Sequence, residues 1–170
     1  AYHGGGIFGE LSSTITVTNS TISDNYSTGV FGRSSRTINV TDSTIANNNG
    51  SGIYSDDLSE IAVTNSIIAD NDGAGIAVSD GGAIAVTNST ITGNGARGIF
   101  GYRGSSITVT DSTISGNTSE SSGGGIYVSQ DSSITVTNST ISGNSAISGG
   151  GIGSHRDCTI TMTNSTISDN

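Results

Sequence analysis

The chain of 170 residues contains no proline, no tryptophan and no lysine, and it has a single cysteine and a single methionine. One cysteine, Cys158, excludes an internal disulfide framework and the common zinc clusters. Five arginines are the only strong bases and the net charge is −9, so few phosphates can be neutralised and no nucleic-acid partner is expected. No apolar run approaches the roughly 18 residues that a membrane span requires. A membrane-spanning protein is therefore not expected either.

What the sequence does contain is a repeat. The segment Ile15–Asn25 and its copies occur seven times in all, and the second isoleucine returns at intervals of 23, 23, 23, 23, 27 and 26 residues. A Gly-Ile or Gly-Val pair marks another fixed point, eight residues before the first isoleucine of each copy. The extra residues of the last two copies must then lie between residues 117 and 125 and between residues 144 and 151. Insertions confined to one place in a constant register are typical of stacked solenoid coils.

Each copy predicts three short strands. In Ile15–Thr18, aliphatic residues and threonine alternate with period two, which is a strand pattern. A turn at Asn19 precedes a second strand, Ser20–Ile22, and Gly6–Phe8 supplies a third. Right-handed connections dominate between parallel strands. The predicted fold is therefore all-β: a right-handed, single-stranded parallel β-helix of seven coils, which forms one domain over residues 1–170.

Equivalent positions of the coils form columns of like residues. Of the 22 isoleucines, 20 occupy the three columns that contain Ile7, Ile15 and Ile22. Because nearly every aliphatic side chain then points inward, a composition of only 31% hydrophobic residues is enough for a dry core. The Ser20 column is serine in all seven coils, and serine is small enough for an inward corner.

Asparagine dominates two further columns. The Asn25 column is asparagine in every coil, and the Asn19 column is asparagine or aspartate in every coil. Coils repeat at the inter-strand spacing of about 4.8 Å. We therefore expect the stacked amides to hydrogen-bond to one another and to cap backbone groups at the corners.

These elements resemble the polymorphic outer-membrane protein repeats of bacteria, which carry a Gly-Gly-Ala-Ile element and a Phe-x-x-Asn element. Here a Gly-Gly-Gly-Ile element occurs at Gly4–Ile7, Gly123–Ile126 and Gly149–Ile152. Ile141–Asn144 is one example of Ile-x-x-Asn, in which isoleucine replaces the phenylalanine of the family, and the glycine run is interrupted at Gly73–Gly75. The resemblance implies a secreted or surface-displayed β-helix, often part of a longer adhesin or autotransporter-like passenger, without catalytic residues.

Four outward columns, those of Thr16, Thr18, Thr21 and Ser23, carry no charge at any of their 28 positions. Such ranks resemble the Thr-x-Thr faces of β-solenoid ice-binding proteins, which implies an ice-binding face as an alternative function. That face would consist of Thr16, Thr18, Thr41, Thr64, Thr87, Thr108, Thr110, Thr135, Thr137, Thr161 and Thr163. Threonine also suits any exposed strand, and the turn at Asn19 can divide the four columns between two faces.

Aromatic residues form an outward stripe after the Gly-Ile pair. Five of the eight aromatic residues of the chain belong to it: Phe8, Phe31, Tyr54, Phe100 and Tyr127. Exposed aromatic stripes are typical of partner surfaces and of sugar stacking. The competing interpretation is that the next loop, residues 10–13 and its equivalents, covers the rings.

Most charged residues lie in that loop, and Asp57, Asp80 and Arg103 on successive coils imitate the acid, base and cation of pectinase-like β-helix enzymes. We interpret them instead as solvated ion pairs. Candidate calcium ligands are Asp70 with Asp72, or Asp56 with Asp57 and Glu60, but the Gly-Asp nonapeptide of calcium β-rolls is missing. No metal, cofactor or catalytic residue is therefore predicted.

The function predicted first is a non-catalytic structural or adhesive rod, not an enzyme, in a secreted or cell-surface protein. Its ligand would be a host protein, a glycan or ice, and the alternatives are the ice-binding module and a polysaccharide-binding or polysaccharide-cleaving β-helix. Neither end of the sequence contains a polar cap, which solenoids need. We therefore expect a fragment of a longer array, or coils that stack end to end.

Overall fold

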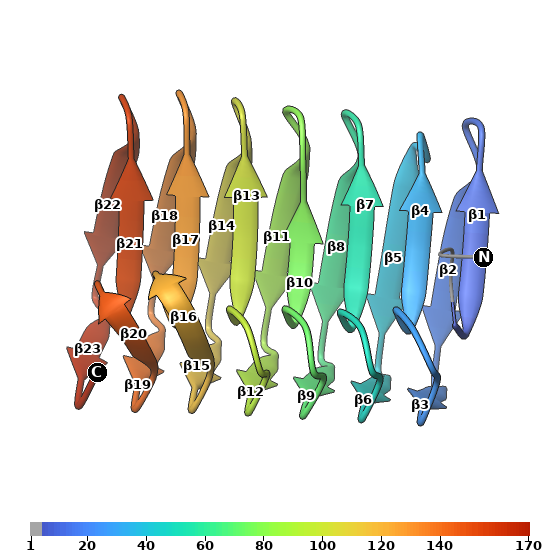
Figure 1. Cartoon of the computed structure of the whole chain (residues 1–170), viewed down its shortest axis with the longest axis horizontal. Coiled ribbons are helices and arrows are strands. Elements are labelled where there is room, and N and C mark those ends of the chain that lie inside the picture. The colour runs from blue at the N-terminus through green and yellow to red at the C-terminus, as the bar shows by residue number, and fades with distance from the viewer. Residues whose placement is uncertain (1–4) are drawn as a thin grey trace.

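The computed structural model describes residues 5–170, so Gly4 of the first Gly-Gly-Gly-Ile element lies outside the described residues. Every regular element in this range is a β-strand, and the strands stack side by side along a rod (Figure 1). The described part of the chain contains no helix with the length and hydrophobicity needed to span a lipid bilayer.

Three seven-stranded sheets run along the rod, and each coil contributes one strand to each sheet. Sheet A contains β1 (Ile7–Glu10), β4 (Val30–Arg33), β7 (Ile53–Asp56), β10 (Ile76–Val78), β13 (Ile99–Tyr102), β17 (Ile126–Ser129) and β21 (Ile152–His155). Sheet B contains β2 (Thr14–Thr18), β5 (Thr37–Thr41), β8 (Glu60–Thr64), β11 (Ala83–Thr87), β14 (Ser106–Thr110), β18 (Ser133–Thr137) and β22 (Thr159–Thr163). Sheet C contains β3 (Thr21–Ser23), β6 (Thr44–Ala46), β9 (Ile67–Ala69), β12 (Thr90–Thr92), β15 (Thr113–Ser115), β19 (Thr140–Ser142) and β23 (Thr166–Ser168).

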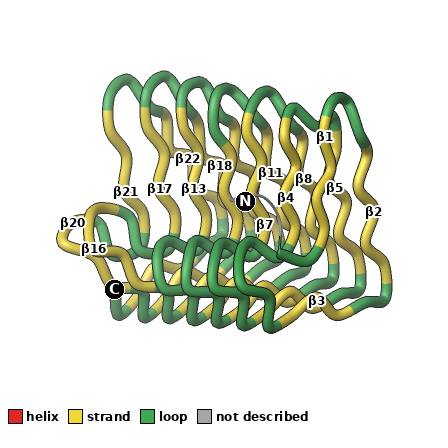
Figure 2. The backbone as a smooth tube through the Cα atoms, turned by 45° about the vertical axis from the view of Figure 1, so that its right-hand side comes forward, coloured by secondary structure: helices red, strands yellow, loops and turns green. Residues whose placement is uncertain are grey.

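All neighbouring strands are parallel, and equivalent residues pair across coils, as Ile15 pairs with Ile38 in sheet B. In Figure 2 each coil passes once through each of the three sheets, and the chain then enters the next coil. The predicted all-β, right-handed parallel β-helix of seven coils is confirmed.

The three isoleucine columns and the Val17 column fill the interior. In the central coils these side chains are fully buried, as Ile38, Ile68 and Ile99 are. In the last coil Ile160 and Ile167 are 43% and 46% exposed, because no following coil covers them in this chain. The core is therefore a stack whose burial depends on a neighbour on each side.

The Asn25 column forms the predicted amide ladder. Nδ2 of Asn48 donates to Oδ1 of Asn71 (2.8 Å), and Nδ2 of Asn71 donates to Oδ1 of Asn94 (2.9 Å). The same Oδ1 atoms accept the backbone N–H of the preceding coil's asparagine, as Asn71 Oδ1 does from Asn48 N (3.2 Å). The ladder thus closes the corner between sheets C and A with buried, satisfied polar groups.

The Asn19 column, at the corner between sheets B and C, carries only part of such a ladder. Within residues 5–170 its side chains form two bonds along the column, from Asn65 to Asp42 (3.1 Å) and from Asn88 to Asn65 (2.8 Å). Each residue of the column instead adopts a positive φ, 48° at Asn19 itself. Asparagine and aspartate tolerate this left-handed conformation, so their main role here is to form the turn.

The insertions of the last two coils lie where the spacing predicted them. They form β16 (Thr118–Ser122) and β20 (Ser145–Ser148), which pair with each other as a two-stranded sheet D. In Figure 1 this sheet lies on the viewer's side of the rod, beside the beginnings of β17 and β21. The extra residues therefore stand next to sheet A at one end of the molecule.

Candidate functional site

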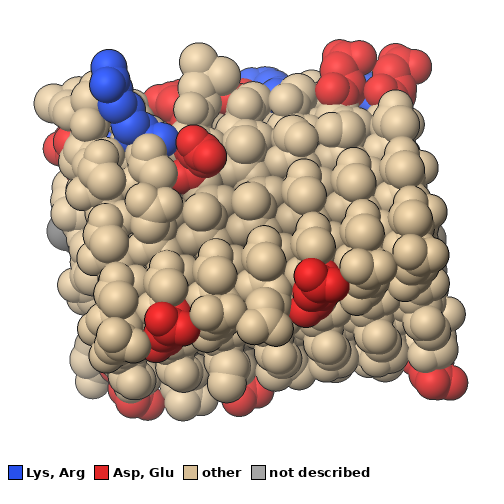
Figure 3. All heavy atoms as spheres, turned by 180° about the vertical axis from the view of Figure 1, so that it is seen from behind, with Lys and Arg blue, Asp and Glu red and all other residues tan. Residues whose placement is uncertain are grey.

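The threonine columns divide between two faces, as the turn at Asn19 allows. The Thr16 and Thr18 columns lie on the outer side of sheet B, and the Thr21 and Ser23 columns lie on sheet C. Seen from behind the view of Figure 1, the face of sheet B is a broad surface with few charged side chains (Figure 3). All the threonines of the predicted ice-binding face therefore share one sheet.

The array on sheet B is complete in only part of the rod. The Thr18 column is unbroken, but the Thr16 column contains Asn39, Ala62 and Ala85 in three consecutive coils. Paired Thr-x-Thr ranks therefore occur in the first coil and in the last three coils.

The aromatic stripe lies on the outer side of sheet A and forms two stacks. The rings of Phe8, Phe31 and Tyr54 follow one another with centroid distances of 5.5 and 5.3 Å. After Ala77, a second stack begins with Phe100 and Tyr127, whose centroids are 6.0 Å apart and whose planes differ by 20°. Phe31 lies between Phe8 and Tyr54 in its stack and is 7% exposed, whereas Phe8 at the beginning of the stack is 42% exposed.

Arg97 joins the second stack. Its guanidinium carbon lies 5.0 Å from the ring centroid of Phe100 and 4.7 Å from that of Tyr127. Its Nε donates a hydrogen bond to the carbonyl oxygen of Ser122 in β16 (2.9 Å). Partial burial lowers the pKa of the Arg97 guanidinium from its ordinary value, with the nearby Tyr127 acting in the opposite direction.

Polar groups continue the same surface toward the loops between sheets A and B. The ring of Tyr102 lies 6.4 Å from that of Phe100, and its hydroxyl accepts a hydrogen bond from Nε2 of Gln130 (2.9 Å). Arg103 lies over the Tyr102 ring at 4.9 Å and pairs with Asp80 at 3.0 Å. The hydrogen bond to Asp80 raises the pKa of Arg103.

The three charged residues compared with pectinase-like enzymes do not converge. Arg103 pairs with Asp80, but Asp57 accepts a hydrogen bond from Ser34 of the preceding coil (2.8 Å). Among residues 5–170, no group of three or more histidine, cysteine, aspartate or glutamate side chains is arranged to hold a metal ion. The surface described by these residues has no enclosed pocket, so the candidate site is an open face.

These features define a parallel β-helix with one aromatic outer face and one threonine-rich outer face. The family model for the right-handed β-helix region matches residues 2–114 and 97–170, so the chain belongs to the right-handed β-helix family. The chain is similar to the A-module of the mannuronan C-5 epimerase AlgE6 of Azotobacter vinelandii, with a TM-score of 0.60 and 17% identity. The alignment covers 95% of this chain and 55% of that structure. A comparison with curated protein sequences gives no match.

The family match confirms the β-helix, and the finer resemblance to polymorphic outer-membrane protein repeats stays a prediction. The prediction that the chain is not an enzyme is contradicted, because the β-helix that it resembles belongs to an epimerase. That prediction relied on the interpretation of Asp57, Asp80 and Arg103 as solvated ion pairs and on the resemblance to repeats without catalytic residues.

Sequence reasoning identified the aromatic stripe but missed Arg97. A signal was present, because the equivalent positions of the other coils hold small residues: Gly5, Thr28, Ser51, Ala74, Gly124 and Gly150. An arginine in such a column indicates a feature of one coil that the repeat itself does not require.

Proposed function

We propose that the chain binds a polysaccharide along the outer face of sheet A. The observation that carries the proposal is the partly exposed stack of Phe100 and Tyr127 with Arg97 against both rings. Aromatic rings offer apolar area to the C–H faces of sugars, and the adjacent polar groups can hydrogen-bond to hydroxyls.

The shape of the surface supports an extended ligand. The aromatic residues recur at the coil spacing of about 4.8 Å along the rod, and the face lacks an enclosed pocket in the part of the chain that the structure describes. A long polymer lying across several coils suits such a face better than a small metabolite, which favours a concave site. The similar epimerase module, by its name, acts on mannuronan, which agrees with a polymeric sugar.

The test replaces Phe100 and Tyr127 singly by alanine and measures binding to a panel of soluble polysaccharides by affinity electrophoresis. We expect about a tenfold loss of affinity for each variant, the size typical of a central aromatic contact. Tyr26→Ala is the matched control, because Tyr26 is 96% exposed and lies in the first coil, away from the second stack. Unchanged retention of both sheet A variants, with thermal unfolding showing intact folds, would refute the proposal.

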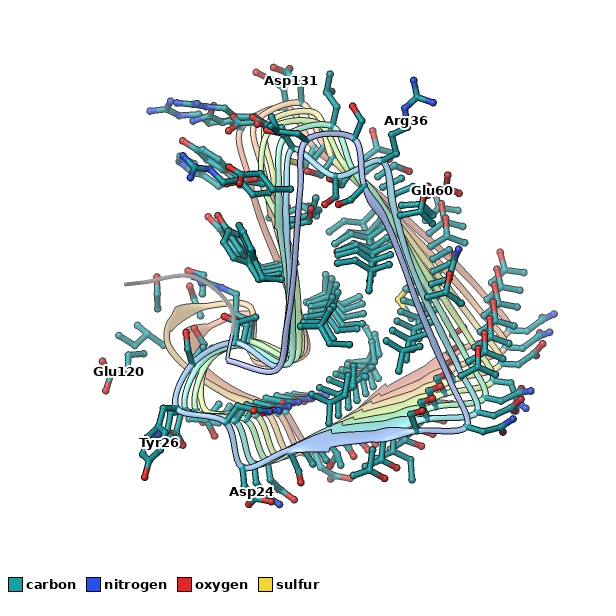
Figure 4. All side chains as sticks on the ribbon, turned by 90° about the vertical axis from the view of Figure 1, so that its right-hand side faces the viewer. Asp24, Tyr26, Arg36, Glu60, Glu120 and Asp131 are labelled. Carbon is teal, nitrogen blue, oxygen red and sulfur yellow. The ribbon has the colours of Figure 1, made fainter. Side chains whose placement is uncertain are left out.

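Ice binding by sheet B is the second candidate function. The observation that favours it is the unbroken Thr18 column. The outward columns of sheet B are those of Thr14, Thr16 and Thr18, and Glu60 in the Thr14 column is the only charged residue among them. Figure 4 looks down the rod and shows successive coils lying over one another with only a gradual offset, so the threonine ranks are regular. Thermal hysteresis of the chain in solution tests this candidate directly.

A further inference from the structure

Three observations distinguish Arg97 from an arginine with a purely structural role on this acidic chain. It is one of five cations on a chain of net charge −9, it is partly buried, and it has no acidic partner within the described residues. The two ion pairs found within residues 5–170 join Arg33 to Glu10 and Arg103 to Asp80. The Arg97 charge therefore remains uncompensated by any carboxylate of this part of the chain.

The surroundings of Arg97 hold its side chain in place. Gly124 occupies the same column in the next coil and has no side chain, so the Arg97 side chain extends along the rod toward β16 and Tyr127. Its Nε donates to the carbonyl of Ser122, a residue of the insertion that breaks the 23-residue repeat. The inserted strand thus positions the guanidinium beside the aromatic stack.

One edge of the guanidinium stays available to a ligand. The arginine side chain carries five N–H donors, and the bond from Nε to Ser122 is the hydrogen bond that the Arg97 side chain makes within residues 5–170. The remaining donors belong to Nη1 and Nη2, which match the two oxygens of a carboxylate in a bidentate pair. Contact with two rings strengthens such a pair, because the rings keep water from one side of the cation.

We propose that Arg97 binds the carboxylate of a uronic-acid residue, so that the ligand of sheet A is an acidic polysaccharide. This inference rests on the proposed polysaccharide binding and adds its substrate class. In the bound state the Nη1 and Nη2 atoms donate to the carboxylate oxygens, and the sugar ring lies against the neighbouring aromatic side chains. The insertion of the last two coils then determines specificity, because Ser122 of β16 orients the arginine.

The experiment compares two ligands that differ only in the carboxylate: a mannuronan oligosaccharide and its carboxyl-reduced counterpart. Both are titrated calorimetrically into the wild-type chain, Arg97→Gln and Arg36→Gln. Arg36→Gln removes the same charge from an exposed arginine that Figure 4 shows on the side of sheet B. We expect the wild type and Arg36→Gln to prefer the uronate by about tenfold and Arg97→Gln to lose that preference, as the loss of a charge-assisted hydrogen bond implies.

The outcomes separate the inference from the proposal beneath it. The role of Arg97 is overturned if Arg97→Gln binds the uronate as tightly as the wild type does, or if the wild type does not prefer the uronate to the neutral oligosaccharide. The proposed polysaccharide binding still stands in that case if the wild type binds the neutral oligosaccharide and Phe100→Ala abolishes this binding. If the wild type binds neither sugar, both the role of Arg97 and the proposed polysaccharide binding are overturned. Binding of polyglutamate in preference to the uronate also overturns the inference, because the ligand would then be an acidic peptide.

A second variant covers the case in which Arg97→Gln does not fold. Arg97→Lys keeps the charge but has no planar fork of donors, and thermal unfolding reports its stability. If Arg97→Lys prefers the uronate severalfold less than the wild type does, the result supports the bidentate contact. If its preference is unchanged, the bidentate contact is overturned.

Discussion

Among single residues, the buried asparagines depend most on their neighbours. Asn71 is 1% exposed, accepts hydrogen bonds from the backbone and side-chain nitrogens of Asn48, and donates to Ile45 O and Asn94 Oδ1. An aliphatic residue of similar size offers neither the donor nor the acceptor. Repetition of asparagine in this column therefore has a physical reason beyond duplication of the repeat.

Asn71→Ala should lower the free energy of unfolding by about 3 kcal/mol, because it leaves buried donors and acceptors of two neighbouring coils unpaired. Asn138→Ala is the matched control on the exposed corner, because Asn138 has a φ of 50° and is exposed. There we expect a loss of about 1 kcal/mol, which comes from alanine in a left-handed conformation. Chemical denaturation of both variants measures the difference, and equal losses would mean that the ladder does not contribute.

Strands of sheet A begin after a glycine for a steric reason. A Cβ on Gly52 would lie 2.8 Å from the carbonyl oxygen of Gly75 and 2.9 Å from Nδ2 of Asn71. The backbone of one coil therefore approaches the next coil and its asparagine ladder closely at this point. The Gly-Ile pair that marks each coil in the sequence is thus a packing requirement of the element, not a flexible hinge.

Gly52→Ala should destabilise the chain by about 2 to 3 kcal/mol, the range for overpacking against atoms that cannot move aside. Gly104→Ala tests the contribution of backbone conformation alone, because Gly104 has a φ of +73° and its Cβ would meet no atom closer than 4.0 Å. We expect about 1 kcal/mol there. Thermal melts followed by circular dichroism compare the two, and a larger effect at Gly104 would contradict the steric explanation.

Over the whole molecule, the outer faces differ although they are built from the same repeat. Sheet A carries two aromatic stacks, arginines and the inserted sheet D, and these features vary from coil to coil. Sheet B carries the unbroken Thr18 column, and its substitutions in the Thr16 column are the small or polar residues Asn39, Ala62 and Ala85. A face with local differences suits recognition of a defined ligand, whereas a uniform face suits only a periodic partner such as ice.

Thr110→Tyr places a large ring in the unbroken Thr18 column of sheet B, and Thr113→Tyr places the same ring on sheet C. If sheet B binds ice, Thr110→Tyr should abolish most of the thermal hysteresis, because a ring interrupts the regular array of methyls and hydroxyls. Thr113→Tyr should leave the activity nearly unchanged. Hysteresis that survives Thr110→Tyr, or is absent from the wild type, would exclude this function.

The sequence by itself determined the β-helix, its three sheets, the inward columns and the position of the insertions. It could do so because stacking in register places each residue against its equivalent one coil away, so column composition reports burial directly. Only the tertiary structure decided which outward residues meet. The side chain of Arg97 reaches the next coil, where an irregular insertion presents the carbonyl of Ser122 beside Tyr127. No repeat period encodes such a contact, because it depends on side-chain length and on the path of a segment that occurs outside the repeat.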